Sequence, residues 1–126
     1  MRLAVGPGAV ARLIGVARRF AETCGLAPEA ADRLVIVVEE WAANIVEHSA
    51  ARPGSLIVFR LEAQGGVVHA VFTDAGMAFD PRTAAQGDPN PERGGGAGIP
   101  LIRAWSEIED WRRRGGRNRL TLRLRS

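Results

Sequence analysis

The sequence predicts an α+β fold, a two-layer sandwich in which helices cover one face of a mostly antiparallel, mixed β-sheet. Two observations lead to this prediction. Helical periodicity occupies two early segments and one short later segment, whereas strand periodicity comes in two pairs, each joined by a glycine turn. Strands joined by tight turns are antiparallel, so the sheet is expected to be mostly antiparallel. In such α+β folds the helices gather on one face of the sheet.

Two amphipathic helices are expected first. Apolar residues recur with helical spacing from Val10 to Cys24, and Gly25 stands where a left-handed residue would end that helix. A second helix is expected to begin near Pro28, a favourable first position, and to run to about Ser49. The expected apolar faces consist of Val10, Leu13, Ile14, Ala17, Phe20, Ala21 and Cys24 in the first helix and of Leu34, Val38, Trp41, Ala42 and Ile45 in the second.

Strand periodicity begins after the break at 52–54. Residues Ile57 to Glu62 have the period of a half-buried strand, and a turn at 64–66 should return the chain along Val67 to Thr73. A second hairpin is expected near the end of the chain. Its first strand is Glu107 to Arg113, its turn is Arg114-Gly115-Gly116-Arg117, and in its second strand Leu120, Leu122 and Leu124 alternate with arginines.

A segment without periodicity separates the two hairpins. Residues Asp80 to Gly98 are rich in Gly, Pro, Asn and Asp, and about eighteen structureless residues in a small domain usually form a functional loop or a lid. A short helix is expected from about Ile99 to Trp105, and Leu3 to Val5 could add an edge strand. The expected order is strand, helix, helix, hairpin, lid, helix, hairpin.

Length and hydropathy suggest a cytoplasmic protein. The 126 residues, of 13.5 kDa, suit one domain spanning 1–126. No apolar stretch approaches the roughly 20 residues that cross a bilayer, so no membrane partner is expected. The first residues lack a long apolar segment with a cleavage site, and the single cysteine, Cys24, cannot form an internal disulfide.

The absence of lysine excludes several classes of enzyme. All 17 basic residues are arginines. A phosphate-loop NTPase needs Gly-Lys-Ser/Thr, the protein-kinase fold needs a strand lysine, and Schiff-base chemistry needs a lysine amine. Two histidines and one cysteine are too few for a tetrahedral zinc site of the usual ligands. A protein with this composition that handles ATP must do so without a lysine clamp.

The 17 basic residues exceed the 14 acidic residues, and the resulting net charge of +3 could indicate nucleic-acid binding. However, the arginines are spread along the chain, and the one dense run, 112–114, falls in the second predicted hairpin. Such a run is more often a solvated face or a surface for an acidic partner. No direct nucleic-acid partner is therefore expected.

Glu40 and Asn44 lie one turn apart on the second predicted helix, with Glu47 and Arg33 on the same side. A Mg²⁺ ion that carries nucleotide phosphates prefers oxygen ligands and takes one or two from protein, so Asn44 could be a metal ligand. Glu40 could accept a proton from an attacking hydroxyl or water. By itself, the pair is more often a hydrogen-bonded pair on a helix surface.

Asp74 follows an apolar strand, where its carboxylate would be poorly solvated without a partner. The exocyclic amine of adenine would satisfy the carboxylate, and Gly76 would let the base lie against bare backbone. Because Asp-x-Gly also commonly caps a turn, the motif by itself favours the turn.

A glycine run, Gly94-Gly95-Gly96-Ala97-Gly98, leads into the short predicted helix. Free amides and a helix dipole form an anion site, to which Arg93 would add charge. No strand precedes the run, so it is not a dinucleotide fingerprint. A flexible linker is an equally good interpretation.

Together, the order and spacing of these segments resemble the GHKL family of ATP-binding domains, and within it the small bacterial anti-sigma-factor serine/threonine protein kinases of the histidine-kinase-like ATPase group. The resemblance covers nearly the whole chain. Residues 37–48 resemble the family's N box, 74–81 its first glycine box and 94–102 its second. The ending 116–122 is similar to the family's last strand, in which alternation directs Asn118 toward the helices and the pocket.

The resemblance implies a histidine-kinase-like ATPase fold with ATP and Mg²⁺ as cofactors. Asn44 would hold the metal, Glu40 would be the catalytic base, Asp74 would read adenine and Gly76 would shape the base pocket. The segment Gly94 to Gly98 would wrap the phosphates. The implied cofactor-binding residues are Asn44, Asp74, Gly76, Arg93, Gly94, Gly95, Gly96, Ala97, Gly98 and Asn118.

Two residues depart from the pattern of this family. Pro100 lies at the start of the helix after the lid, which is tolerable in the first turn of a helix. Position 41 is Trp, where a small residue is expected. Packing of Trp41 in the core is the favoured explanation, and a reshaped site is the alternative.

The resemblance also implies a function. The protein would be an ATP-dependent serine/threonine protein kinase of the anti-sigma regulatory type, which phosphorylates a STAS-domain anti-anti-sigma protein and controls the availability of a sigma factor. A sigma factor as second partner and a homodimer are compatible with this function. The alternative is a non-catalytic ATP-binding module that holds a partner. Glu40 permits phosphoryl transfer but does not decide between the two.

Overall fold

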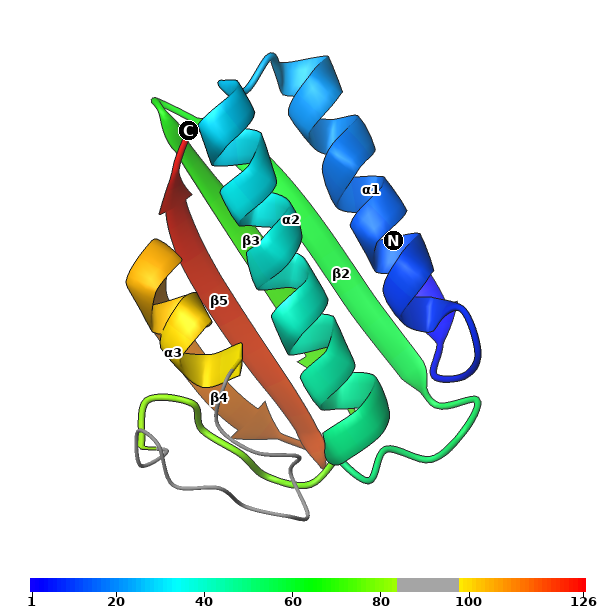
Figure 1. Ribbon diagram of the computed structural model, residues 1–126. Coiled ribbons are helices and arrows are strands. Elements are labelled where there is room, and N and C mark those ends of the chain that lie inside the picture. Colours follow the sequence, from blue (N-terminus) through cyan, green and yellow to red (C-terminus); the bar gives the residue numbers. More distant parts are fainter. Residues whose placement is uncertain (84–97) are drawn as a thin grey trace.

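The chain folds into a five-stranded antiparallel sheet with helices on one face, as the computed structural model shows (Figure 1). The structure describes residues 1–83 and 98–126, and the elements below belong to this part of the chain. The predicted α+β architecture and the predicted order of elements are confirmed. None of the helices in the described ranges is long and apolar enough to span a membrane.

The first hairpin consists of β2 (Leu56–Gln64) and β3 (Val67–Asp74). Gly65 and Gly66 join them with φ angles of 60° and 79°, left-handed values that glycine adopts without a steric penalty. Two successive residues with positive φ make a turn whose twist matches that of the strands. The predicted turn is confirmed, and β3 extends one residue further than expected, to Asp74.

The second hairpin consists of β4 (Glu107–Arg114) and β5 (Arg117–Arg125), and the N-terminal strand is β1 (Arg2–Ala4). The strand order is β1-β2-β3-β5-β4, so β5 lies between the first hairpin and the edge strand β4. This arrangement makes β3 and β5 central neighbours. Their antiparallel register places Asp74 opposite Asn118 at one end of the sheet.

Two long helices, α1 (Ala9–Cys24) and α2 (Pro28–Ala43), cover one face of the sheet (Figure 1). α1 ends at Gly25, whose φ of 65° is left-handed, as predicted. After α2 the chain continues through a π-helical turn, η1 (Asn44–His48), which the sequence did not predict. A π-helical turn has hydrogen bonds between residues five apart and is therefore wider than an α-helical turn. It occurs mostly as a single turn and often at a functional site.

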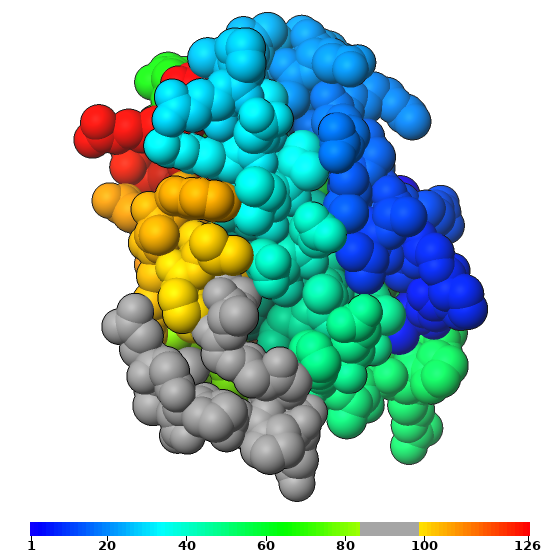
Figure 2. All heavy atoms as spheres, viewed as in Figure 1, coloured from blue at the N-terminus to red at the C-terminus, as the bar shows by residue number. Residues whose placement is uncertain are grey.

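A third helix, α3 (Gly98–Trp105), lies beside α2 over the same face. In the space-filling view, the atoms of the three helices form the surface of this face (Figure 2). α3 leads into β4 through the single residue Ser106. Its predicted existence and approximate bounds are confirmed.

The core lies between these helices and the sheet, and its centre includes the stacked rings of Phe59 and Phe72. All five apolar residues predicted for α2 are buried. The prediction for α1 is wrong at Cys24, which is exposed. Cys24 lies in the last turn of the helix, and Leu26, just beyond that end, packs against the core instead.

Candidate functional site

The end of the sheet where β3 meets β5 is closed by hydrogen bonds around two buried polar side chains. Asp74 and Asn118 are 2% and 3% exposed. Asn118 Nδ2 donates to Asp74 Oδ1 at 3.2 Å, to the Met77 carbonyl oxygen at 2.9 Å and to that of Gly76 at 3.3 Å. Asn118 therefore lies on the helix side of β5, as strand alternation predicted.

Among the described residues, hydrogen bonds reach only one oxygen of the Asp74 carboxylate. Oδ1 accepts the Gly76 backbone N–H at 2.8 Å in addition to the Asn118 amide. This is the turn-capping role that Asp-x-Gly commonly has. Within residues 1–83 and 98–126, no donor hydrogen-bonds to Oδ2. Oδ2 therefore remains available to a ligand amine while Oδ1 holds the turn.

Gly76 lies at a close approach between two segments. A Cβ at position 76 would lie closer than 3.0 Å to the Oγ, Cβ and O of Ser49. The Met77 N–H donates to Ser49 O at 2.7 Å, and Ser49 Oγ donates to Ile45 O at 2.5 Å. The loop after β3 is thus joined to the end of the α2–η1 helix. This contact gives one reason for glycine at position 76, and its role in shaping a base pocket stays a prediction.

Asn44 lies where α2 passes into η1 and is 9% exposed. Its Nδ2 is buried, and neither amide atom hydrogen-bonds to a described residue. A buried polar group left without a partner costs about 1–3 kcal/mol. That penalty falls on the donor Nδ2. Oδ1, which accepts no hydrogen bond from a described residue, is an oxygen ligand of the type that Mg²⁺ accepts.

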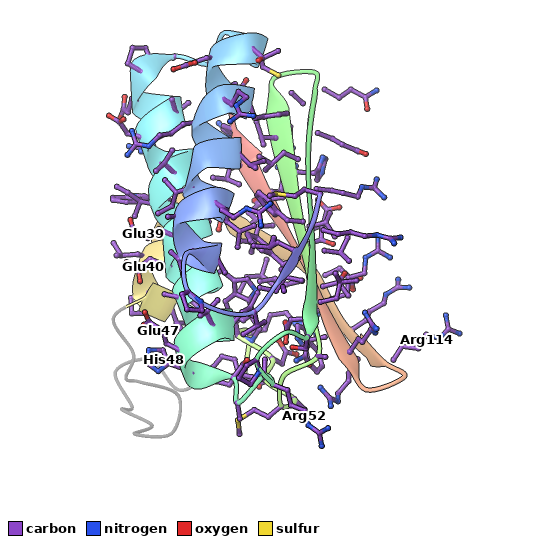
Figure 3. The ribbon with its side chains drawn as sticks, turned by 90° about the vertical axis from the view of Figure 1, so that its right-hand side faces the viewer. Glu39, Glu40, Glu47, His48, Arg52 and Arg114 are labelled. Carbon is purple, nitrogen blue, oxygen red and sulfur yellow. The ribbon has the colours of Figure 1, made fainter. Side chains whose placement is uncertain are left out.

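Glu40 precedes Asn44 by one helical turn and is half-buried. Burial raises the pKa of Glu40 above its ordinary value of 4.5, and the neighbouring Glu39 raises it further by charge repulsion. Glu39, Glu40, Glu47 and His48 lie along one side of α2 and η1 (Figure 3). A carboxylate with a raised pKa is better suited to accept a proton than an ordinary one.

Arg33, which the sequence placed on the same side as Glu40, pairs with another residue. Its Nη2 donates to Glu29 Oε1 at 2.7 Å, and both side chains are exposed. No described contact links Arg33 to Glu40 or Asn44. The structure therefore gives Arg33 no part in this site.

The turn that follows the loop after β3 is fixed by charged side chains. Asp80 is partly buried, which opposes its ionisation, but hydrogen bonds and the charge of Arg82 hold the pKa of Asp80 below its ordinary value. Arg103 of α3 donates to the carbonyl oxygens of Pro81 and Arg82, at 2.7 Å each. The last residues before position 84 are thereby tied to the helix that begins at Gly98.

The predicted phosphate-binding segment falls mostly outside the described residues, since only Gly98, the first residue of α3, belongs to them. The roles predicted for Arg93, Gly94, Gly95, Gly96 and Ala97 stay predictions. Within the described ranges, no three His, Cys, Asp or Glu side chains come together in a way that could hold a metal ion.

Trp41 belongs to the core, as the favoured interpretation predicted. It is 1% exposed, and its ring centroid lies 6.3 Å from that of Phe79. Two residues of the site, Ser49 and Arg113, were not identified from the sequence. Arg113 Nη1 donates to Asn118 Oδ1 at 2.9 Å and to Gly76 O at 3.0 Å. Strand alternation within the run 112–114 could have separated it from its neighbours.

Comparisons with known proteins agree with the fold. A family model described as the histidine kinase-like ATPase domain matches residues 3–124. No curated protein matches the chain. Among solved structures, the chain is similar to one from the crystal structure of the SiaB-SiaC complex from Pseudomonas aeruginosa, with a TM-score of 0.55 and 13% identity over 98% of this chain and 88% of that one. At this identity the likeness shows the fold alone.

The contact between positions 76 and 49 predicts a specific coupling. Gly76→Ala should lower the free energy of unfolding by about 1–3 kcal/mol, because the added methyl group must displace the Ser49 backbone or side chain. Ser49→Gly removes two of the three atoms that the methyl group would meet. In the Ser49→Gly background, Gly76→Ala should therefore cause a smaller loss, measured by urea denaturation. Equal losses in the two backgrounds would show that the contact does not limit residue 76.

Proposed function

The chain belongs to the histidine kinase-like ATPase domain family, and from this premise we propose that it is an ATP-dependent serine/threonine protein kinase of the anti-sigma regulatory type. Its protein substrate would be a STAS-domain anti-anti-sigma protein, so that phosphorylation controls the availability of a sigma factor. One observation carries the proposal. Two buried polar side chains near the junction of α2 and the sheet, Asp74 and Asn44, keep atoms that the described fold does not use.

The base would be recognised at Asp74. Its Oδ2 would accept the exocyclic amine of adenine, while Oδ1 holds the turn through Gly76 and the Asn118 amide. A base with a carbonyl oxygen in place of that amine would face the carboxylate with two acceptors and no proton between them. Such a mismatch leaves buried polar groups unpaired, which is the strongest source of discrimination between similar ligands.

The metal would be held by Asn44 through its amide oxygen. Bound Mg²⁺ would neutralise phosphate charge and orient the γ-phosphate, the main requirements of phosphoryl transfer. The residue present fits this role, because the Asn44 amide has no competing partner in the described chain and an amide oxygen is a ligand that Mg²⁺ accepts.

Glu40 would act as the base in the transfer step. It would take the proton of the substrate hydroxyl as the hydroxyl oxygen bonds to the γ-phosphorus and the bond from that phosphorus to the bridging oxygen breaks, which releases ADP. The position of Glu40 one turn from Asn44 supports this role, because it would place the base beside the metal-bound phosphates. Its raised pKa supports the same role.

We propose further that the chain binds a partner protein. One solved structure to which this chain is similar is a complex of two proteins, which supports a partner-binding use of the fold. A STAS-domain protein is the partner type that the family resemblance implies. A module that binds ATP and a partner without transfer is the alternative, and the transfer experiment distinguishes the two.

Phosphoryl transfer to a STAS-domain protein should depend on Glu40. With ATP labelled in the γ-phosphate and a panel of purified STAS-domain proteins from the source cell, label should appear on one of them. In Glu40→Gln the rate should fall by at least about a hundredfold, the range that general-base catalysis supplies. Glu62→Gln, at an exposed site in β2, is the matched control and should leave the rate unchanged. ATP binding without transfer to any member of the panel would favour the non-catalytic module.

Removal of the Asn44 amide should abolish the metal-dependent part of ATP affinity. In calorimetric titrations the wild-type protein should bind ATP at least about tenfold more tightly with Mg²⁺ than with a chelator, a difference of about 1.4 kcal/mol. Asn44→Ala should bind equally weakly under both conditions, and Asn44→Asp, which retains an oxygen ligand, should keep the dependence on Mg²⁺. A full metal effect in Asn44→Ala would remove Asn44 from the metal site.

The pH dependence of transfer should reveal the interaction between Glu39 and Glu40. A base must be ionised, so the single-turnover rate should fall as pH falls through the raised pKa of Glu40. Glu39→Gln removes one cause of the raised pKa, so the fall should move to lower pH. Glu47→Gln is the control on η1 and should leave the profile in place. An unchanged profile in Glu39→Gln would contradict the assignment of Glu40 as the base.

A further inference from the structure

Arg113 lies behind the side chains that the proposed function assigns to the base. We infer that it is a positioning residue for base recognition. It fixes the orientation of the Asn118 amide, and through it the Asp74 carboxylate, so that the site prefers a purine with an exocyclic amine. This inference rests on the proposed function and adds to it a determinant of nucleotide specificity.

The three successive arginines 112–114 are equivalent in type but not in position. β4 and β5 pair Arg113 with Asn118, whereas the residues on either side of Arg113 fall on the opposite face of the sheet. Arg112 pairs there with Asp110 at 2.8 Å. Arg114 extends from the end of the hairpin, away from the helices (Figure 3). Of the three, only Arg113 contacts the candidate site in the described structure.

The contacts of Asn118 permit one orientation of its amide. Nδ2 faces three acceptors, which are Asp74 Oδ1 and the carbonyl oxygens of Gly76 and Met77. Oδ1 faces Arg113 Nη1, its only donor among the described residues. A flipped amide would turn its oxygen toward three acceptors and its N–H groups toward a cation. Arg113 therefore completes the set of contacts that selects this orientation.

The orientation of Asn118 decides which Asp74 oxygen remains available. With Nδ2 directed at Oδ1, that oxygen carries two hydrogen bonds and Oδ2 carries none from the described chain. Arg113 Nη1 also donates to Gly76 O at 3.0 Å, so one nitrogen holds both the amide and the loop. Without this donor the Asn118 amide can tilt or flip, and the carboxylate can turn and present either oxygen.

Arg113 can be replaced with little effect on the core. The residue is exposed, while the two hydrogen bonds that it makes are partly buried. If Arg113 only held the edge strand β4, its replacement would lower the stability of the protein and weaken the binding of all nucleotides equally. A positioning role changes the preference between bases. The ratio of affinities for two nucleotides with the same phosphates therefore separates the two roles.

The test compares ATP with inosine triphosphate, which carries a carbonyl oxygen in place of the exocyclic amine. Calorimetric titration with Mg²⁺ should show that the wild-type protein prefers ATP. Arg113→Met, which keeps the aliphatic stem and removes the donors, should reduce this preference by at least about fivefold, chiefly through weaker ATP binding. Arg113→Lys, which keeps one charged donor nitrogen on a shorter side chain, should give an intermediate value. Arg112→Met and Arg114→Met are the matched controls and should keep the wild-type preference.

Each outcome decides the inference. A folded Arg113→Met variant with the wild-type preference overturns it, and so does an equal reduction in the control variants. If Arg113→Met shows no cooperative unfolding, Arg113→Lys decides, and a preference equal to that of the wild type overturns the inference. If the wild-type protein binds neither nucleotide, the proposed function fails together with the inference. If the wild-type protein prefers ATP and Arg113→Met has the same preference, only the inference fails and the proposed function stands.

Discussion

The pairing of β3 with β5 is the constraint on which the candidate site depends. Turn chemistry sets the register within each hairpin, but only the pairing of β3 with β5 places Asp74 opposite Asn118. These residues are polar and deeply buried, so they must satisfy each other. The Asn118 amide donates hydrogen bonds to one carboxylate oxygen of Asp74 and to two carbonyl oxygens of the loop. The register of two strands thereby determines the shape of the loop that follows Asp74.

The helix layer supplies the other half of the site, and the contact between Ser49 and Gly76 joins the two halves. Because the loop backbone lies directly against Ser49, the end of the α2–η1 helix and the end of β3 hold a fixed relative position. Near this contact along the chain, two polar groups have no hydrogen-bond partner among residues 1–83 and 98–126, the Asn44 amide and Asp74 Oδ2. Folded proteins rarely leave such groups unsatisfied except where a ligand or water binds.

The sequence predicted those features that depend on neighbours along the chain. The helices, both glycine turns and the inward direction of Asn118 follow from periodicity and turn chemistry. The features that it did not predict depend on contacts between distant segments. The close approach of Gly76 to Ser49 spans the whole first hairpin, and Arg113 reaches Asn118 only after β4 has paired with β5. The exposure of Cys24 depends on where the core ends, which periodicity alone does not reveal.

Magnesium-bound ATP, as proposed, would contact Asn44 with its metal and the Asp74–Asn118 pair with its base. The side-chain amide signals of Asn44 and Asn118 in a ¹⁵N-labelled protein test this binding mode most directly. The signals can be assigned with Asn44→Ser and Asn118→Ser. Addition of ATP with a chelator should shift the Asn118 signal, and subsequent excess Mg²⁺ should shift the Asn44 signal as well. If both signals keep their positions at saturating ATP and Mg²⁺, while other resonances move, the nucleotide binds elsewhere and the account is wrong.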